Sequence, residues 1–461
     1  MAVTANRVGF GIGAVGKDLV YALVTGFILY YYNSVLGVSG TFLGIIMMVA
    51  RVFDAVDDPV MGVLVAKTRT RWGRFRPWIL VGTVANAAMI VALFAVPPSV
   101  EGVGLLVWVS VFYMLWGATY TMMDIPFWSL IPAITQAGSA REKLVVVGRV
   151  GAALGGFLPA ALTMLLVSRI GNGSREGFMA VAIGAAVIFV LAQLVTVGLV
   201  RDASERTDSV PEKSPTMREM LSALWRNDQA LVVVVAIVIS SIAMYLTGQL
   251  AVYFFQFDIG DSDVLTIFAV VGLTAQVAAM LAYPALRRRM STRSILISGL
   301  GAMAGGYVTL FVLASAGLHE SALLALGAAV LYVGSGLLSI LTTVFLADTV
   351  DYGEWKTGRR DESVIFSLQT FVAKLGSAIA VLIAGIGLDV IGLDAEASAQ
   401  SAGTLVGLRV LMFLVPIAFL VATAVVFLRR YRLDQARLVR IGEELRARAA
   451  ASTGDSANAP R

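Results

Sequence analysis

Residues 40–66 read GTFLGIIMMVARVFDAVDDPVMGVLVA, an apolar run long enough to cross a bilayer that nevertheless contains one arginine and three aspartates. Each ionisable side chain costs about 2.5–3.5 kcal/mol near the centre of a bilayer. Asp54, Asp57 and Asp58 together therefore cost roughly 8–10 kcal/mol if the costs add. Because a lipid-facing helix needs no such charges, the cluster indicates a functional site inside a membrane protein.

The rest of the chain has the composition of an integral membrane protein. Apolar residues make up 58% of it, charged residues 14%, and the mean hydropathy is +0.84. The chain has no cysteine, which excludes disulfides, thiolate nucleophiles and cysteine metal sites. We predict an all-α membrane protein with twelve transmembrane helices, at residues 10–35, 40–66, 77–97, 104–134, 144–168, 177–200, 229–256, 263–286, 294–315, 320–347, 363–388 and 405–428.

Basic residues predict the orientation of these helices. The connections at 67–76 and 287–293 and the tail from residue 429 are rich in arginine, whereas the alternate connections hold only Arg169 and Arg175. The positive-inside rule therefore places both termini in the cytoplasm, which agrees with an even number of spans. The net charge of +5 belongs to these loops, so we expect contact with the lipid bilayer and no nucleic-acid partner.

The longest polar interruption divides the chain into two similar halves. We predict a six-helix bundle over residues 1–200, a cytoplasmic middle loop over 201–228 and a second six-helix bundle over 229–428. Each half has an arginine-rich connection after its second span, which is typical of a transporter built from two repeats. Residues 429–461 are predicted to form a cytoplasmic amphipathic helix followed by a disordered tail.

Three groups of residues are predicted to lie at the membrane surfaces. The apolar face of the tail helix would rest on the inner surface of the membrane through Leu433, Leu438, Ile441 and Leu445. The tyrosines at 30–32 would form an interfacial aromatic belt. Arg409 would extend its guanidinium to the outer interface.

The three aspartates share one face of their helix, because they are spaced i, i+3 and i+4. Adjacent carboxylates need a counter-charge, supplied by sodium, lithium, a proton or a basic side chain such as Arg51. A purely structural Arg–Asp network is the alternative. The single histidine, His319, falls in a predicted outer loop, so the aspartates would have to carry any coupled proton.

The fourth span carries a second polar group with a different character. Trp116, Tyr120, Thr121, Asp124 and Trp128 lie within about four helical turns. Carboxylates accept hydrogen bonds from pairs of sugar hydroxyls, and an indole face covers the C–H face of a pyranose. This combination favours a carbohydrate ligand, although tryptophan at membrane depth is also compatible with ordinary packing.

Lone cations in other apolar spans are candidate partners for these acids. Arg149 in the fifth span and Lys374 in the eleventh are interpreted as partners of the buried aspartates. The first span contains Lys17 and Asp18, for which the alternative is that the lysine reaches from the end of the span to the interface.

Several motifs in the same order resemble the melibiose-permease type of the glycoside–pentoside–hexuronide:cation symporter family, within the major facilitator superfamily. The resemblance covers nearly all twelve spans. The motifs are Gly16-Lys-Asp18, Arg51 to Gly62, Arg71-Trp-Gly-Arg-Phe-Arg-Pro-Trp-Ile-Leu80, Trp116 to Pro132, Asp351-Tyr-Gly-Glu-Trp-Lys356, and Gln369-Thr370 with Lys374.

The resemblance implies roles for individual residues. It implies that Asp54, Asp58 and Thr121 bind the coupling cation, and that they would be the metal ligands if the ion is Na+. The sugar-binding set that it implies is Lys17, Asp18, Asp124, Trp128 and Arg149, with Lys374 bridging the two sites. Asp57 departs from the family, in which that position is commonly neutral, and this departure leaves Na+, H+ and Li+ open as coupling ions.

We therefore expect a monomeric sugar:cation symporter of the major facilitator fold in a bacterial inner membrane, without an organic cofactor and without enzymatic activity. It would import a glycoside, pentoside or hexuronide by alternating access. One alternative is a cation-coupled carrier of a lipid or drug on the same fold. A second is a membrane sensor or an intramembrane hydrolase that uses paired aspartates.

Overall fold

The computed structural model describes residues 2–134, 139–171, 175–200, 225–261, 263–358, 362–394, 397, 399–434, 436–445 and 447. Most of the predicted middle loop, residues 201–224, lies outside these ranges, as does the predicted disordered tail. The side chains of Gln369 and Thr370 are also outside the described part.

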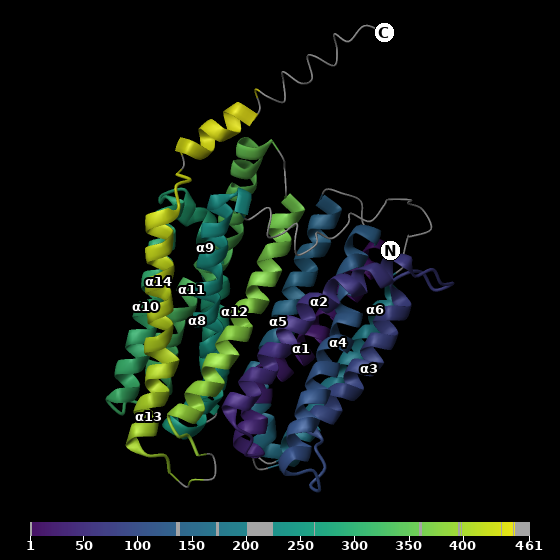
Figure 1. Ribbon diagram of the computed structural model, residues 1–461, viewed down its shortest axis with the longest axis vertical. Coiled ribbons are helices and arrows are strands. Elements are labelled where there is room, and N and C mark those ends of the chain that lie inside the picture. The colour runs from purple at the N-terminus through teal and green to yellow at the C-terminus, as the bar shows by residue number, and fades with distance from the viewer. Residues whose placement is uncertain are drawn as a thin grey trace.

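Every regular element of the described residues is helical, as the sequence predicted, and three π-helical segments (η) extend or interrupt α-helices (Figure 1). The elements are α1 (Ala2–Tyr30), η1 (Tyr31–Val35), α2 (Gly40–Lys67), α3 (Arg76–Phe94), α4 (Gly102–Ile134), α5 (Ser139–Gly171), α6 (Arg175–Leu199), α8 (Asp228–Tyr253), η2 (Phe254–Ile259), α9 (Asp263–Arg287), α10 (Thr292–Ser315), α11 (Ser321–Thr357), α12 (Glu362–Val390), α13 (Ala402–Arg409), η3 (Val410–Leu414) and α14 (Val415–Arg430).

The helices have the length and composition of membrane spans. Eleven helical stretches of the described residues are long and apolar enough to cross a bilayer. The helix α2, which carries the charged cluster, is not one of the eleven, so the count of twelve stays a prediction. Exposed apolar side chains follow one face of α6 at helical spacing, as expected for a lipid-facing surface, at Ile183, Val187, Leu191 and Leu194.

Helices α1–α6 pack mainly among themselves, and so do α8–α14; we call these groups the N-terminal and C-terminal halves. In the first group α1 contacts α5 and α6, and in the second α11 contacts α9 and α10. The halves meet where α2 packs against α12 and α5 packs against α9. The helix α1 begins and α14 ends at the same end of the molecule (Figure 1). The predicted domain boundaries, and which end is cytoplasmic, stay predictions.

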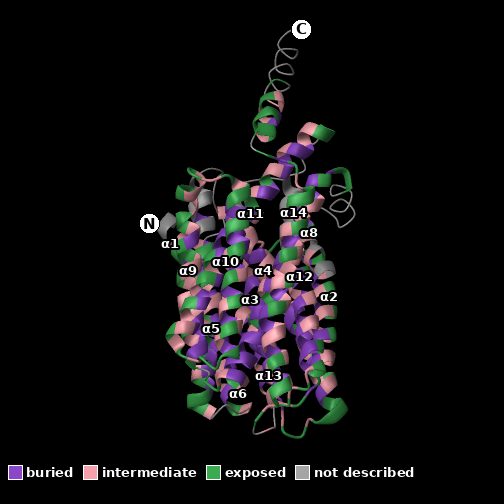
Figure 2. Cartoon of the chain, turned by 90° about the vertical axis from the view of Figure 1, so that its left-hand side faces the viewer, coloured by how far each residue is buried: buried purple, intermediate pink, exposed green. Residues whose placement is uncertain are grey.

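Glycines allow the closest helix contacts, as is usual in membrane bundles. A Cβ atom on Gly155 of α5 would lie 2.2 Å from the carbonyl oxygen of Val15 on α1. One on Gly151 would lie 2.6 Å from the carbonyl oxygen of Gly11. Because α1 also carries Lys17 and Asp18, this contact determines how far those two side chains stand from α5. Buried residues recur along the length of the helices, and exposed residues lie on their outer faces (Figure 2).

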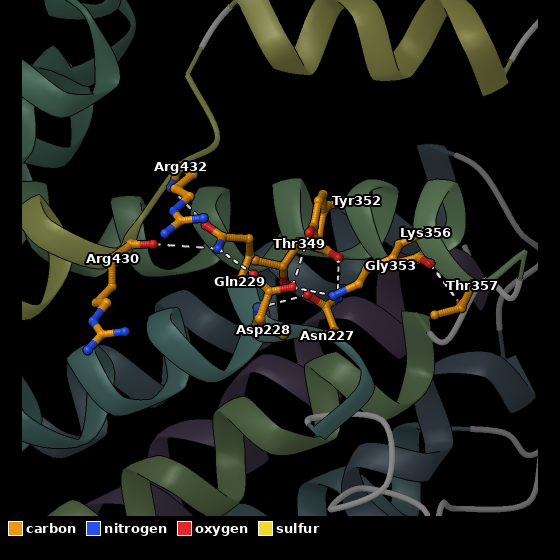
Figure 3. Close-up of polar contacts among 11 residues, drawn as sticks. Asn227, Asp228, Gln229, Thr349, Tyr352, Gly353, Lys356, Thr357, Arg430 and Arg432 are labelled. Atoms are coloured by element: carbon orange, nitrogen blue, oxygen red, sulfur yellow. Dashed lines mark hydrogen bonds and ion pairs between the residues drawn. The ribbon is translucent and has the colours of Figure 1, made fainter.

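The helix α11 continues ten residues beyond residue 347, where the predicted span ends. No glycine in a left-handed conformation interrupts it before Gly358, whose φ is +70°. Polar contacts hold its added turns to the start of α8 (Figure 3). The amide of Asn227 donates to the carbonyl of Thr349 over 2.7 Å, and Asp228 forms an ion pair with Lys356.

The segment after α14 also differs from the prediction. Residues 436–445 are helical, but Leu433 and Ile441 are buried against Tyr352 of α11 instead of lying free for a membrane surface. The indole of Trp355 donates a hydrogen bond to Glu444 over 2.5 Å. The apolar face of this segment is therefore covered by the extension of α11.

Two predictions of interfacial side chains were wrong. Tyr31 and Tyr32 are fully buried, and their hydroxyls donate to the carbonyls of Phe94 and Leu93 over 2.8 Å each, so they anchor η1 to α3. The guanidinium of Arg409 does not extend to an interface, because it binds both carboxylate oxygens of Asp258 at 2.6 and 2.8 Å. A bidentate pair of this kind satisfies both charges inside the protein.

We expect Gly155→Ala to destabilise the protein, because the added methyl group must push α1 away from α5. Overpacking of this kind costs about 1–3 kcal/mol. Gly156→Ala is the matched control, since nothing lies within 4 Å of its Cβ position. Thermal unfolding in detergent, followed by loss of the monodisperse peak in size-exclusion chromatography, measures the difference. Equal stability of the two variants would contradict the tight contact.

Candidate functional site

Lys17 is the centre of one buried polar group. Its side chain is 3% exposed, and its ammonium lies 2.9 Å from an oxygen of Asp18 and 2.8 Å from an oxygen of Asp124. The lysine comes from α1 and Asp124 from α4, so the ion pairs join two helices. The alternative that Lys17 reaches the interface is excluded by this burial and pairing.

Aromatic and cationic side chains surround this group. The ammonium of Lys17 lies 4.9 Å from the centre of the Trp128 ring, and the guanidinium carbon of Arg149 lies 5.1 Å from the same ring. The side chains of Asp18 and Asp124 remain 22% and 27% exposed, so a ligand can reach them. The structure thus brings together two carboxylates, two cations and one indole, a set that suits a polyhydroxylated ligand.

The charged cluster of α2 forms the second group. Asp54 is buried, and Arg51 donates to one of its oxygens over 3.3 Å. One oxygen of Asp58 accepts from the hydroxyl of Thr121 on α4 over 3.2 Å. The other oxygen of Asp58 forms an ion pair with Lys374 of α12. This pair joins the N-terminal half to the C-terminal half.

Asp57 lies in the same cluster, and one of its carboxylate oxygens is buried without a hydrogen-bond partner. With every group ionised, three carboxylates face Arg51 and Lys374, so the cluster has one negative charge in excess. Across the described ranges, no three His, Asp or Glu side chains converge as a metal-binding group.

The rings of Tyr21 and Tyr120 connect the two groups. The guanidinium carbon of Arg51 lies 5.5 Å from the ring centre of Tyr21, which lies 5.0 Å from that of Tyr120. The ammonium of Lys17 donates to the hydroxyl of Tyr120 over 3.4 Å. The cation-π and hydrogen-bond contacts thus form a continuous path from the α2 cluster to the Lys17 group.

Gly117 is a site residue that the sequence analysis missed. A Cβ atom at this position would lie 2.9 Å from an oxygen of Asp54, so any larger residue would make that carboxylate shift. Gly117 and Tyr21, which was also missed, share one signal that could have found them, and Tyr120 shows the same signal. Each lies four residues, about one helical turn, before or after a residue predicted to bind sugar or cation.

Solved structures identify the fold. A bacterial homologue of the human lysosomal transporter Spinster, in an inward-facing and unoccupied conformation, matches with a TM-score of 0.70 and 12% identity, over 95% of this chain and 97% of the other. The nucleoside transporter NupG matches with a TM-score of 0.67 and 10% identity, over 93% of this chain and 100% of the other. The chain is a multi-pass membrane protein with the major facilitator fold.

The family follows from the sequence. Residues 9–435 match the model of the MFS/sugar transport protein family, and the chain belongs to this family of transporters, which are not enzymes. The isoprimeverose transporter of Lactiplantibacillus pentosus is 29% identical, over 94% of this chain and 90% of its own length. The inner membrane symporter YicJ of Escherichia coli is 28% identical, over 95% and 94%. The putative sulfoquinovose importer of Salmonella typhimurium is 29% identical, over 96% and 93%.

We expect Gly117→Ala to weaken cation-dependent transport, because the Asp54 carboxylate must shift to make room for the new methyl group. Gly104→Ala on the same helix is the matched control, since its Cβ would meet only ordinary contact at 3.8 Å. Sugar uptake by proteoliposomes at increasing sodium concentration, or at increasing proton gradient, reports the change. A half-saturating ion concentration that is equal in both variants would contradict it.

Proposed function

We propose that the protein is a secondary active symporter that imports a sugar with a cation by alternating access, in a bacterial inner membrane. The observation that carries this proposal is the ion pair between Lys374 and Asp58. This pair joins the two halves at Asp58, which the motif resemblance assigns to the cation site. Asp58 also accepts a hydrogen bond from Thr121. Relatives named as an isoprimeverose transporter and as a symporter support the same function.

The sugar is proposed to bind at the Lys17 group. Asp18 and Asp124 would accept hydrogen bonds from hydroxyls, and the Trp128 indole would cover an apolar face of the ring. Arg149 is exposed beside Trp128, where it would donate to ring oxygens or to an acidic substituent of the sugar. A carrier of a lipid or drug would need an apolar cavity, and these charged side chains do not favour one.

The cation is proposed to bind at Asp54, Asp58 and Thr121. Lys374 already neutralises Asp58, so an arriving cation competes with an ammonium that belongs to the other half. Release of Lys374 would loosen the contact between the halves, which couples cation binding to their movement. By linkage, the cation and the sugar then change each other's affinity by the same factor.

Asp57 is proposed to contribute the excess negative charge that attracts one monovalent cation. Its unpartnered buried oxygen is an acceptor for that ion or for a proton. This position would thus help to decide between Na+, Li+ and H+.

We expect Asp54→Asn to abolish cation-driven accumulation and to leave some passive sugar exchange, because the sugar group is intact while the cation loses a ligand. Counterflow and gradient-driven uptake of a radiolabelled glycoside panel, in the same proteoliposomes, separate the two activities. Glu101→Gln, which changes an exposed carboxylate outside the site, should preserve both. Full accumulation by the Asp54 variant would refute the proposed cation site.

Asp57→Asn is expected to weaken the apparent affinity for the driving ion by at least about tenfold, because one of three neighbouring carboxylates loses its charge. Sugar binding without the ion should change by less than about twofold, a difference below 1 kcal/mol. Isothermal titration with sugar, without the ion and at a series of ion concentrations up to saturation, measures both quantities. An unchanged ion affinity would remove Asp57 from the site.

A further inference from the structure

The carboxylate of Asp389 ties the end of α12 to the start of α2. One of its oxygens accepts from the backbone N–H of Gly40 over 2.9 Å. The other accepts from the hydroxyl of Ser39 over 2.7 Å and from the backbone N–H of Thr41 over 2.9 Å. The first N–H groups of a helix have no partner within it, and its positive end favours an anion. Asp389 satisfies both requirements from the opposite half of the protein.

Glycines bring the two helices into backbone contact next to this carboxylate. A Cβ on Gly385 of α12 would lie 2.0 Å from the carbonyl oxygen of Gly40. One turn further along α2, a Cβ on Gly44 would lie 3.0 Å from the Cα of Leu382. The two halves therefore touch over two consecutive turns, and no larger residue would permit that approach.

Other contacts between the halves occur towards the same end. The amide of Gln249 on α8 donates to the carbonyl of Thr25 on α1 over 2.9 Å. The hydroxyl of Thr266 on α9 donates to the carbonyl of Ala161 on α5 over 2.6 Å. This is the end at which α13 begins, opposite to the end where α1 begins and α14 ends (Figure 1).

We propose that Asp389 and Gly385 form a latch with residues 39–41, and that this latch holds this end of the transporter closed. The inference rests on the proposed alternating access but not on the identity of the sugar or of the cation. The helix α2 keeps a cap of its own, because the Ser39 hydroxyl also accepts from the N–H of Phe42 over 3.3 Å. Loss of Asp389 therefore releases the contact between the halves without removing the start of α2.

Spin labels test the latch directly. The chain has no cysteine, so Glu101→Cys and Leu318→Cys introduce the only two thiols. Both positions are exposed, and they lie in connections of opposite halves at the latched end, away from the latch itself. Electron–electron double resonance on the full-length protein in nanodiscs, without sugar or coupling ion, then gives the ratio of the short to the long distance.

We expect Asp389→Ala to raise the ratio of the long to the short distance at least about tenfold, because three charge-assisted hydrogen bonds are lost. Asp389→Asn should give a smaller rise, and Gly385→Ala should also favour the long distance. Asp263→Asn, in the first turn of α9 at the same end, and Gly248→Ala, with nothing within 4 Å of its Cβ, are the matched controls.

The latch is refuted if the Asp389→Ala variant has the same distance distribution as the labelled protein with Asp389. It is also refuted if the control variants change the distribution as much. Should the alanine variant not fold, the asparagine variant decides, since it preserves the shape and one acceptor oxygen. Because the measurement needs no substrate, failure of the latch is distinguishable from failure of the sugar:cation assignment, which uptake assays test separately.

Discussion

The structure depends on one constraint, namely that a charge buried in a membrane-spanning bundle must find its counter-charge within the protein. Lys17 meets it by pairing with Asp18 and Asp124, and Asp58 meets it by pairing with Lys374. The Lys17–Asp124 and Asp58–Lys374 pairs each join two helices, so they also fix the position of one helix relative to another. The charged side chains that make the chain costly to insert into a membrane thus also form the ion pairs that hold its central helices together.

The pairs differ in what they connect. Lys17 and Asp124 lie within the N-terminal half, so their ion pair does not link the two halves. The Lys374–Asp58 pair crosses between the halves, as does the contact of Asp389 with α2. A transporter that alternates between two states needs contacts of both kinds, stable ones for recognition and reversible ones for movement.

Glycines, as well as charged side chains, determine how closely two helices approach each other. Gly155 lets α1 lie against α5, and Gly117 leaves space for the Asp54 carboxylate. In a sequence rich in glycine, the spacing of Gly117 from Thr121 marks it only as a candidate, and nothing local marks Gly155. Their importance appears only when the opposing helix is in place, because the contact involves a carbonyl or carboxylate oxygen far away in the chain.

Sequence alone determined that the chain is a helical membrane protein, because long apolar runs and basic loops carry that information locally. It also singled out Asp54, Asp58, Asp124 and Lys374, because charges in apolar spans are conspicuous. Tertiary structure decided which charges meet. It also showed that Tyr31 and Tyr32 are buried anchors and that the tail helix packs on α11. Those outcomes depend on distant surfaces, whose shape no local pattern encodes.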